Sequence, residues 1–460
     1  MDTMTGLDHA ERRALEARLA SRAEDVSTEE LDRLARDHWW RGEVPEAVRL
    51  DELVHHRLVA AGRVVEGAER ALRVSLQWGT RGDITLAMAW LSRADRLLRD
   101  QPVCVVHGYA EYARAAADLD FVGEPTAATD AAKELAALAR RFPDPTLECF
   151  ALALDGMAAV RSGDSGGFAA LDEAMIPVLG GQVDPLWGGD IFCSVIHLCE
   201  ALGDLARMRS WTDSLAAWST PLSTTFLYAG VTRIHQLQLL RAEGEWDQVE
   251  RELAERSAGL ADAHGWLAGA GFYELGEVHR LRGRNDEAVA AYSQARAFGI
   301  DPQPGEAELW HATGRTADAL TALHVSLAER GRLDRARVIG PAVDIALAAG
   351  DTTLAASLVD ELEQTASFFG TPGLHAAAAQ ARAALLTEGG EHDAALARLE
   401  DAATVYRHQR SRHATARVHE AMSVAHRRLG HTDQADAAEA TARAIYQHLG
   451  AQADLRRLDA

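Results

Sequence analysis

The stretch FYELGEVHRLRGRNDEAVAAYSQA, residues 272–295, places one glycine between two segments rich in helix-forming residues. Alanine and straight-chain side chains lose little rotamer freedom in a helix, so both segments are expected to be helical. Gly283 can adopt the left-handed conformation that ends a helix, because it has no Cβ to clash. The stretch therefore predicts an antiparallel helical hairpin that turns at Gly283.

Turns of the same kind recur along the whole chain. Their glycines are Gly42, Gly82, Gly123, Gly163, Gly203, Gly244, Gly283, Gly314, Gly350, Gly390 and Gly430. Eight of the ten intervals between them are 39 to 41 residues long, and the other two are 31 and 36. A single hairpin cannot bury its own apolar face, whereas stacked hairpins build a continuous core. The repeat predicts an all-α solenoid, a superhelix of about eleven hairpins with a period near 40 residues.

The repeat also suggests how the chain is organised. Residues 1–27 are expected to form a lead-in helix, followed by an N-terminal hairpin array over 28–300. A C-terminal array over 301–455 should continue the first without a break. The short interval from Gly283 to Gly314 predicts a bend or a shortened hairpin around 296–330.

Composition limits the classes of function. The 460 residues carry 69 acidic and 47 basic side chains, for a net charge of −22. Nucleic-acid surfaces need clustered cations, so the chain by itself is a poor nucleic-acid binder. Four cysteines without a CxxC pair argue against a disulfide framework. A charged N-terminus and the lack of apolar runs of roughly 20 residues predict a cytoplasmic protein that does not enter a membrane.

The opening hairpin resembles the tetratricopeptide (TPR) repeat. Six of its residues fall on the positions that the TPR pattern reserves for aromatic, small and apolar side chains: Phe272, Leu275, Gly276, Ala288, Tyr292 and Ala295. His279 departs from the pattern, because it stands where the family has a second aromatic residue. The period near 40 exceeds the usual repeat length of the family, so the helices should be longer.

Three longer strings, residues 179–211, 271–305 and 343–363, resemble the helical-repeat region of large actinobacterial LuxR-type transcriptional regulators. The similarity extends from about residue 30 to residue 455. In that family this region senses signals or binds proteins, and a helix-turn-helix domain commonly follows it. The sequence here ends at LRRLDA, where that domain would begin. The resemblance therefore implies a free-standing sensor or adaptor that acts in regulation without contacting DNA itself.

The TPR resemblance also implies which residues line a concave groove. In that family the first helix of each hairpin faces the groove, and spacings of three and four residues share one helix face. Counted from the turn glycines, the groove positions are Tyr273, Glu277, Arg280, Gln238, Arg241, Asp190, His197, Glu200, Glu308 and His311. Such a polar groove would take a protein or peptide partner, or a small effector; the alternative is an ordinary solvated surface.

An enzyme remains a second hypothesis. Asp190, Cys193, His197 and Glu200 lie on one helix face, and Cys and His at this spacing can share a metal ion. No paired CxxC, H-E-x-x-H, nucleophile-elbow or phosphate-loop motif supports it. Cys193 is equally suited to a helix–helix interface. We therefore expect a protein that is not an enzyme and needs no metal or cofactor.

Two further features leave alternatives open. Trp187 sits in the Gly-rich stretch 180–190, which is either a loop that closes over a ligand or a plain connector. Residues 404–430 carry six Arg and four His against Glu420 alone, which is either a docking patch or a solvated helix face. A third hypothesis for the whole chain is a structural module that forms homo-oligomers through its terminal hairpins.

Overall fold

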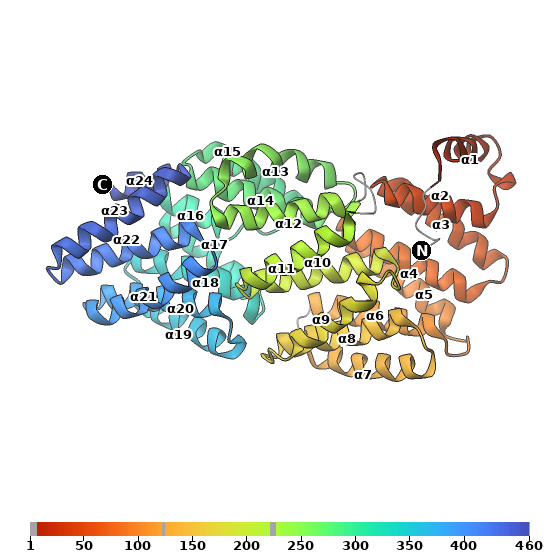
Figure 1. Cartoon of the computed structure of the whole chain (residues 1–460), viewed down its shortest axis with the longest axis horizontal. Coiled ribbons are helices and arrows are strands. Elements are labelled where there is room, and N and C mark those ends of the chain that lie inside the picture. The colour runs from red at the N-terminus through yellow and green to blue at the C-terminus, as the bar shows by residue number, and fades with distance from the viewer. Residues whose placement is uncertain (1–6, 122–124, 221–226, 460) are drawn as a thin grey trace. The chain divides into compact units, whose positions relative to one another are not determined.

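The computed structural model describes residues 7–121, 125–220 and 227–459. These residues form twenty-four α-helices and one short 3-10 helix, without a strand, which confirms the predicted all-α solenoid class. Figure 1 labels the helices in chain order. They are α1 (His9–Ser21), η1 (Ala23–Asp25), α2 (Thr28–Trp40), α3 (Val44–Ala60), α4 (Val64–Arg81), α5 (Ile84–Leu98), α6 (Val105–Phe121), α7 (Pro125–Arg141), α8 (Pro145–Arg161), α9 (Gly167–Leu179), α10 (Pro185–Ala201), α11 (Leu205–Ser219), α12 (Leu227–Glu243), α13 (Trp246–Leu260), α14 (Gly265–Leu281), α15 (Asn285–Ala297), α16 (Gly305–Ala312), α17 (Thr316–Ala328), α18 (Arg332–Ala348), α19 (Thr352–Phe369), α20 (Pro372–Glu388), α21 (His392–His408), α22 (Arg412–Arg428), α23 (Thr432–Leu449) and α24 (Gln452–Leu458).

The predicted glycine turns are present between the two helices of each hairpin. Ten of the eleven glycines have φ between +66° and +92°, and the eleventh, Gly123, lies outside the described residues. At Gly283 the backbone N–H of Arg284 donates to the carbonyl of His279 at 2.9 Å. The N–H of Gly283 itself donates to the carbonyl of Arg280 at 2.9 Å. These bonds close the helix end and turn the chain into α15, as the sequence predicts.

The TPR-like residues bring α14 and α15 into close contact. A Cβ at Gly276 would lie 2.5 Å from the Cε1 atom of Tyr292, so only glycine permits this approach. Ala288, Tyr292 and Ala295 are fully buried on the facing side of α15. Leu275 is also buried, which confirms that Leu275 and Tyr292 belong to the core.

Helix length sets one hairpin apart from the others. Most helices have 13 to 18 residues, whereas α16 has only 8 and α17 has 13. The hairpin within 296–330 is thus a short one, and prolines at 302 and 304 precede it. Among the residues that the structure describes, none of the helices is both long and apolar enough to cross a membrane.

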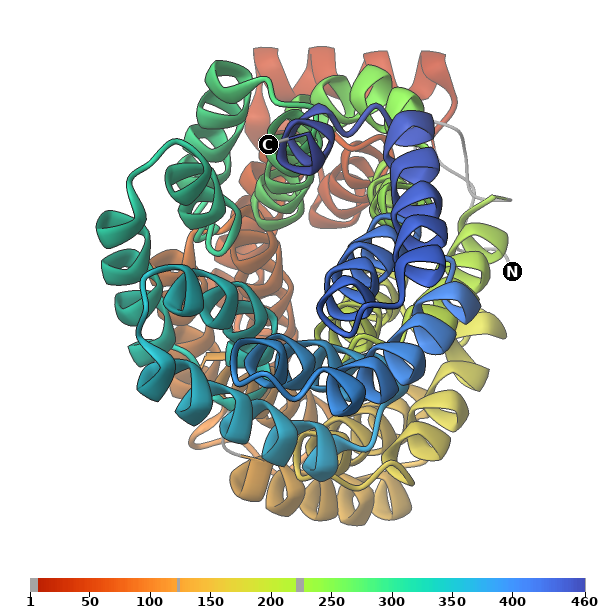
Figure 2. The same ribbon diagram turned by 90° about the vertical axis from the view of Figure 1, so that its left-hand side faces the viewer.

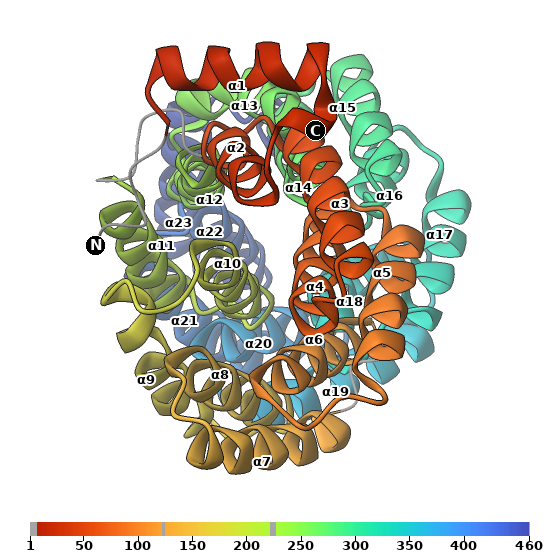
Figure 3. The ribbon, with the colours of Figure 1, turned by 90° about the vertical axis from the view of Figure 1, so that its right-hand side faces the viewer.

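The chain divides into two compact units. Unit 1 comprises residues 1–195, 213–232 and 259–266, and unit 2 comprises residues 196–212, 233–258 and 267–460. In unit 1, neighbouring helices from α2 to α9 pack one against the next (Figure 3). The predicted boundary between 300 and 301 falls inside unit 2, so the division into two arrays there stays a prediction.

Within unit 2 the hairpins curve until the last ones contact the first (Figure 2). The Thr371 hydroxyl donates to the carbonyl of Leu202 at 2.6 Å, and the Gln409 amide donates to the carbonyl of Gly203 at 2.8 Å. The rings of Trp246 and His413 lie 5.8 Å apart between centroids. The helices that begin at residues 372 and 412 therefore pack on the glycine turns at 203 and 244.

Candidate functional site

The first helices of successive hairpins in unit 2 carry a connected set of polar side chains, which we call the inner row. Its members are Glu200, His235, Gln238, Arg241, Glu274, Glu277, Arg280 and Glu308. Six of the eight were predicted as groove positions, and His235 and Glu274 were not. The row therefore contains most of the predicted groove residues of unit 2.

The row begins where α10 ends and crosses to α12. The Gln238 side-chain amide donates to the Glu200 carboxylate at 3.4 Å. Its carbonyl oxygen accepts from Nδ1 of His235 at 2.8 Å. His235 is only 1% exposed, and burial lowers its pKa. His235 is thus a neutral core residue at pH 7 that orients Gln238.

The link from α12 to α14 is an ion pair between Arg241 and Glu274. Glu274 is buried, which explains why it needs a cation beside it. Tyr273, the neighbouring predicted groove residue, is also buried and packs on Tyr292 with ring centroids 6.0 Å apart. The guanidinium of Arg337 from α18 lies 5.1 Å from the centre of the Tyr273 ring. Tyr273 therefore forms part of the wall behind the polar row.

Glu277 is the most heavily bonded member of the row. Its carboxylate accepts two bonds from Arg280, at 2.8 and 3.1 Å, and one from the hydroxyl of Tyr292. Burial opposes ionisation, but the charge of Arg280 and these bonds hold the pKa of Glu277 well below its usual value. Arg280 also reaches Glu308 of α16 at 3.1 Å. The pair of Glu277 and Arg280 is thus ionised. Through Glu308, Arg280 also links α14 to α16, the first helices of two successive hairpins.

A cavity of about 410 Å³ lies at the end of this row. It is lined by Arg280, Leu281, Asn285, Glu308, Leu309, His311, Ala312, Pro341, Asp344, Ile345, Arg417, Ala453, Asp454, Arg456 and Arg457. Arg280, Glu308 and His311 were predicted as groove positions from the sequence. The structure brings these three together around one cavity with charges of both signs.

The short helix α24 forms one wall of this cavity. Asp454 accepts from Nε2 of His413 at 2.8 Å and from Arg457 at 2.7 Å. Arg457 also donates to Glu420 at 2.6 and 2.8 Å, so α24 is held by ion pairs to α22. Arg456 is exposed; its guanidinium lies against the turn at Gly283 and forms no ion pair among the described residues. One guanidinium at the cavity is therefore available to a ligand.

The residues of the enzyme hypothesis have different environments. Cys193 is buried, and burial raises the pKa of its thiol well above the usual value. A thiol of this kind is a poor nucleophile and a poor metal ligand, because both roles need the thiolate. His197 lies 3.8 Å from Glu200, in the inner row. Within the described residues, no group of three or more His, Cys, Asp or Glu side chains is arranged to hold a metal ion.

Unit 1 has a polar cavity of its own, of about 330 Å³. Beside it the fully buried Asp51 accepts from Arg70 at 2.6 Å, from Gln77 at 2.9 Å and from Arg73 at 3.3 Å. Arg70 also pairs with Asp32, so one carboxylate on α2 and one on α3 bind the same guanidinium. We call Asp32, Asp51, Arg70 and Arg73 the inner cluster of unit 1.

This cavity was not predicted from the sequence, although three of its lining residues follow the same spacing from a turn glycine as the predicted groove positions. The count that gives Glu277 and Arg280 from Gly283 can be repeated from Gly42. The position of Glu277 then corresponds to Arg36, that of Tyr273 to Asp32, and that of Asp190 before Gly203 to Glu29, and all three of these residues line the cavity of unit 1. The position of Arg280 corresponds to Trp39, which does not line it. Asp51 could not be found in this way, because it lies on the second helix of its hairpin.

The structure shows where two further predicted features lie, Trp187 and the basic segment 404–430. Trp187 lies in the first turn of α10, is buried, and packs on Phe150 with ring centroids 5.2 Å apart. It is a packing residue in the wall of the unit 1 cavity. Trp39 and Trp246 are also buried, each within its own hairpin. The basic segment 404–430 spans the end of α21, a turn, and α22.

No protein-family model matches the chain, and no curated protein matches it. Among solved structures it is similar to a chain from the crystal structure of the APC/C hetero-tetramer Cut9-Hcn1, with 14% sequence identity and a TM-score of 0.48. That similarity covers 95% of this chain and 84% of the other.

Proposed function

We propose that the chain is a cytoplasmic recognition protein that binds a charged segment of a partner protein in the cavity of unit 2. The observation that carries the proposal is the convergence of Arg280, Glu308 and His311 on one cavity whose wall also holds an unpaired guanidinium, Arg456. Charged groups of both signs suit a peptide segment, whose own side chains can replace the existing ion pairs. A small effector is a second candidate, because about 410 Å³ falls in the range of small-molecule pockets.

A place in transcriptional regulation is part of the proposal. Its support is the resemblance of residues 179–211, 271–305 and 343–363 to the helical-repeat region of LuxR-type regulators. With a net charge of −22, DNA contact would be made by a separate protein. Recognition at the cavity would then couple a signal to that protein.

The test needs a variant that changes the cavity without unfolding the unit. Replacing Tyr273 or Glu277 would disturb buried contacts, so it could not separate binding from folding. Arg456→Glu reverses an exposed charge that has no partner, and Arg398→Glu makes the same change on α21 at an exposed residue that does not line the cavity. Stability is expected to change by less than about 0.5 kcal/mol in both variants.

Wild-type protein immobilised on resin would first capture partners from the native host, and mass spectrometry would identify them together with co-purifying small molecules. The purified partner would then be titrated into wild type and both variants. We expect Arg456→Glu to weaken binding at least about tenfold and Arg398→Glu to leave it unchanged. Equal affinity of the two variants would rule out the cavity as the binding site.

A further inference from the structure

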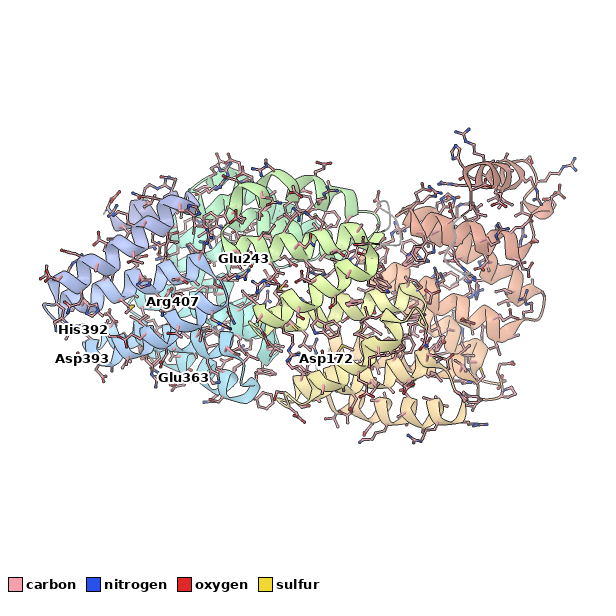
Figure 4. All side chains as sticks on the ribbon, viewed as in Figure 1. Asp172, Glu243, Glu363, His392, Asp393 and Arg407 are labelled. Atoms are coloured by element: carbon pink, nitrogen blue, oxygen red, sulfur yellow. The ribbon has the colours of Figure 1, made fainter. Side chains whose placement is uncertain are left out.

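The turn between α21 and α22 borders a second hollow in unit 2, of about 460 Å³. It is lined by Glu243, Glu245, Tyr406, Arg407, Arg410, Arg412, Thr415 and Ile445. Glu243 and Arg407, both labelled in Figure 4, border it from α12 and α21. None of these residues belongs to the inner row or lines the cavity beside α24.

Three arginines meet at this hollow, and the two carboxylates that also line it, Glu243 and Glu245, form only long ion pairs with them. Arg410 is 3.7 Å from Glu243, and Arg412 is 3.9 Å from Glu245. Glu243 is already bound by Arg209, at 2.6 and 3.1 Å, so its charge is largely neutralised. Arg407 makes only a long bond of 3.4 Å to the Thr404 hydroxyl. Arg412 also bonds to Nε2 of His448 at 2.9 Å. The hollow therefore offers two guanidinium groups, those of Arg407 and Arg410, whose hydrogen-bonding capacity is mostly unused.

A helix also begins at the hollow. Ser411 is the N-cap of α22, and its side chain makes no capping bond. Among the described residues, the backbone N–H groups of Arg412, His413 and Ala414 have no acceptor. The N-terminus of a helix carries partial positive charge and binds anions through such N–H groups. This charge adds to that of the three arginines.

The backbone of Arg410 gives an independent indication. Its φ is +61°, and it is the one non-glycine residue with positive φ in the described part of the chain. The other turns with positive φ use glycine, which adopts this conformation without strain. A side chain at this position is therefore strained, and strained residues concentrate at functional sites.

We propose that this hollow binds the phosphate group of a small phosphorylated compound. One planar guanidinium can donate two parallel hydrogen bonds to phosphate oxygens. The positive charge of three guanidinium groups and a helix N-terminus suits a phosphate dianion. The hollow is larger than a bare phosphate needs, and Tyr406 and Ile445 supply an apolar wall for an organic group.

The basic segment 404–430 then has two parts, one that forms ion pairs within the protein and one that binds the ligand. Arg417 and Arg427 form ion pairs, with Asp344 at 3.0 Å and Glu439 at 2.6 Å, and only the turn between α21 and α22 binds the ligand.

Arg410→Gly is the most informative variant. It removes one guanidinium and relieves the backbone strain at the same time. We expect its thermal midpoint to rise while its affinity for phosphate compounds falls. Because the two effects have opposite signs, a loss of binding cannot be ascribed to misfolding. Arg398→Ala removes an exposed arginine of α21 away from the hollow and serves as the charge-matched control.

The probes are phenyl phosphate and inorganic phosphate, titrated calorimetrically into wild type, Arg407→Ala, Arg410→Gly and Arg398→Ala. Phenyl phosphate should bind wild type more tightly than inorganic phosphate. Arg407→Ala and Arg410→Gly should each weaken it at least about tenfold, which is the size of one charge-assisted hydrogen bond, whereas Arg398→Ala should stay within about twofold. Absence of binding to wild type at millimolar concentrations would overturn the proposal. So would equal affinity of Arg410→Gly and Arg398→Ala, or of the two probes.

Discussion

The polar inner faces of the two units differ in which charged side chain remains without an ion-pair partner. In unit 1 the buried Asp51 receives Arg70, Arg73 and Gln77, and the free charged group beside the cavity is the carboxylate of Glu69. In unit 2 Glu277 has the central place, and the free group at the cavity is the guanidinium of Arg456. The buried pairs hold helices together, whereas the free charges border the cavities.

We call Asp51 and Glu277 the hubs of their units, because each binds several side chains. The two hubs also differ in position. Asp51 lies on α3, the second helix of its hairpin, and is fully buried. Glu277 lies on α14, the first helix, next to a cavity-lining arginine. Arg70 and Arg73, which bind Asp51, line the cavity of unit 1 in the same way, so the difference lies in which helix carries the central carboxylate. We predict that Asp51 serves stability, whereas the pair of Glu277 and Arg280 serves both stability and recognition.

The largest expected effect tests the hub of unit 1. Asp51→Ala would leave Arg70 and Arg73 buried without their common carboxylate, and removing one partner of a buried pair typically destabilises by about 3–5 kcal/mol. Asp184→Asn removes the exposed charge that pairs with Arg73 but can still cap α10 through the backbone N–H of Leu186, and it should lower stability by less than about 1 kcal/mol. Urea unfolding would measure both. Similar losses in the two variants would contradict the hub role of Asp51.

A smaller effect is expected at the hub of unit 2. Glu277→Gln keeps the size of the side chain but removes the charge that Arg280 binds, which should lower the free energy of unfolding by about 2 kcal/mol. Because Arg280 lines the cavity, partner binding, measured where Glu277→Gln is still folded, should weaken as well. Asp51→Ala, studied below its unfolding transition, should bind the partner normally. If both hub variants lost binding equally, the proposed difference between the units would fail.

The sequence was sufficient for the hairpin architecture. The turn glycines at 39 to 41-residue intervals reflect a backbone requirement for positive φ, which few residues other than glycine satisfy at low energy. The contact of Gly276 with Tyr292 likewise leaves a pattern that can be recognised without coordinates. Local geometry of this kind is encoded by residues close in the chain.

The sites were only partly predictable, because their residues come from distant hairpins. Arg280, Glu308 and His311 follow from helix periodicity, whereas Asp454 and Arg456 reach the same cavity from α24. That depends on the return of the last hairpins to the first ones within unit 2, which no local pattern reveals. The arginines of the basic segment also could not be sorted into paired and unpaired ones until their partners were known.

Mild acidification should weaken both units through buried histidines. His55 accepts from Nε of Arg93 at 2.7 Å and donates from Nδ1 to the carbonyl of Gly67 at 2.7 Å, so it is neutral when folded. Burial, with the charge of Arg93, lowers the pKa of His55. The unfolded chain binds the proton near pH ~6.5, before the folded chain does, so stability is lost as the pH falls below that value.

The expected slope for His55 is at most one proton, or about 1.4 kcal/mol per pH unit. Urea unfolding between pH 7.5 and pH 5 would measure it. His55→Gln cannot titrate and should reduce the slope. An unchanged slope in His55→Gln would show that this histidine does not contribute. His235 makes the equivalent test in unit 2, since burial also lowers its pKa.

The smallest effect on stability is expected from removing the free charges, Glu69 and Arg456. The effect of these two substitutions on partner binding separates the two units most clearly. Desolvation raises the pKa of Glu69, the charge of Arg70 opposes this rise, and the nearby carboxylates of Asp184 and Glu66 add to it. Glu69→Gln removes this repulsion, so it should change the free energy of unfolding by less than about 0.5 kcal/mol, in the stabilising direction. Arg456→Ala should be equally mild, yet it should weaken partner binding at unit 2, whereas Glu69→Gln should leave that binding intact. A partner that lost affinity for Glu69→Gln to the same extent would have to contact the cavity of unit 1, and the two inner faces would then act together in recognition.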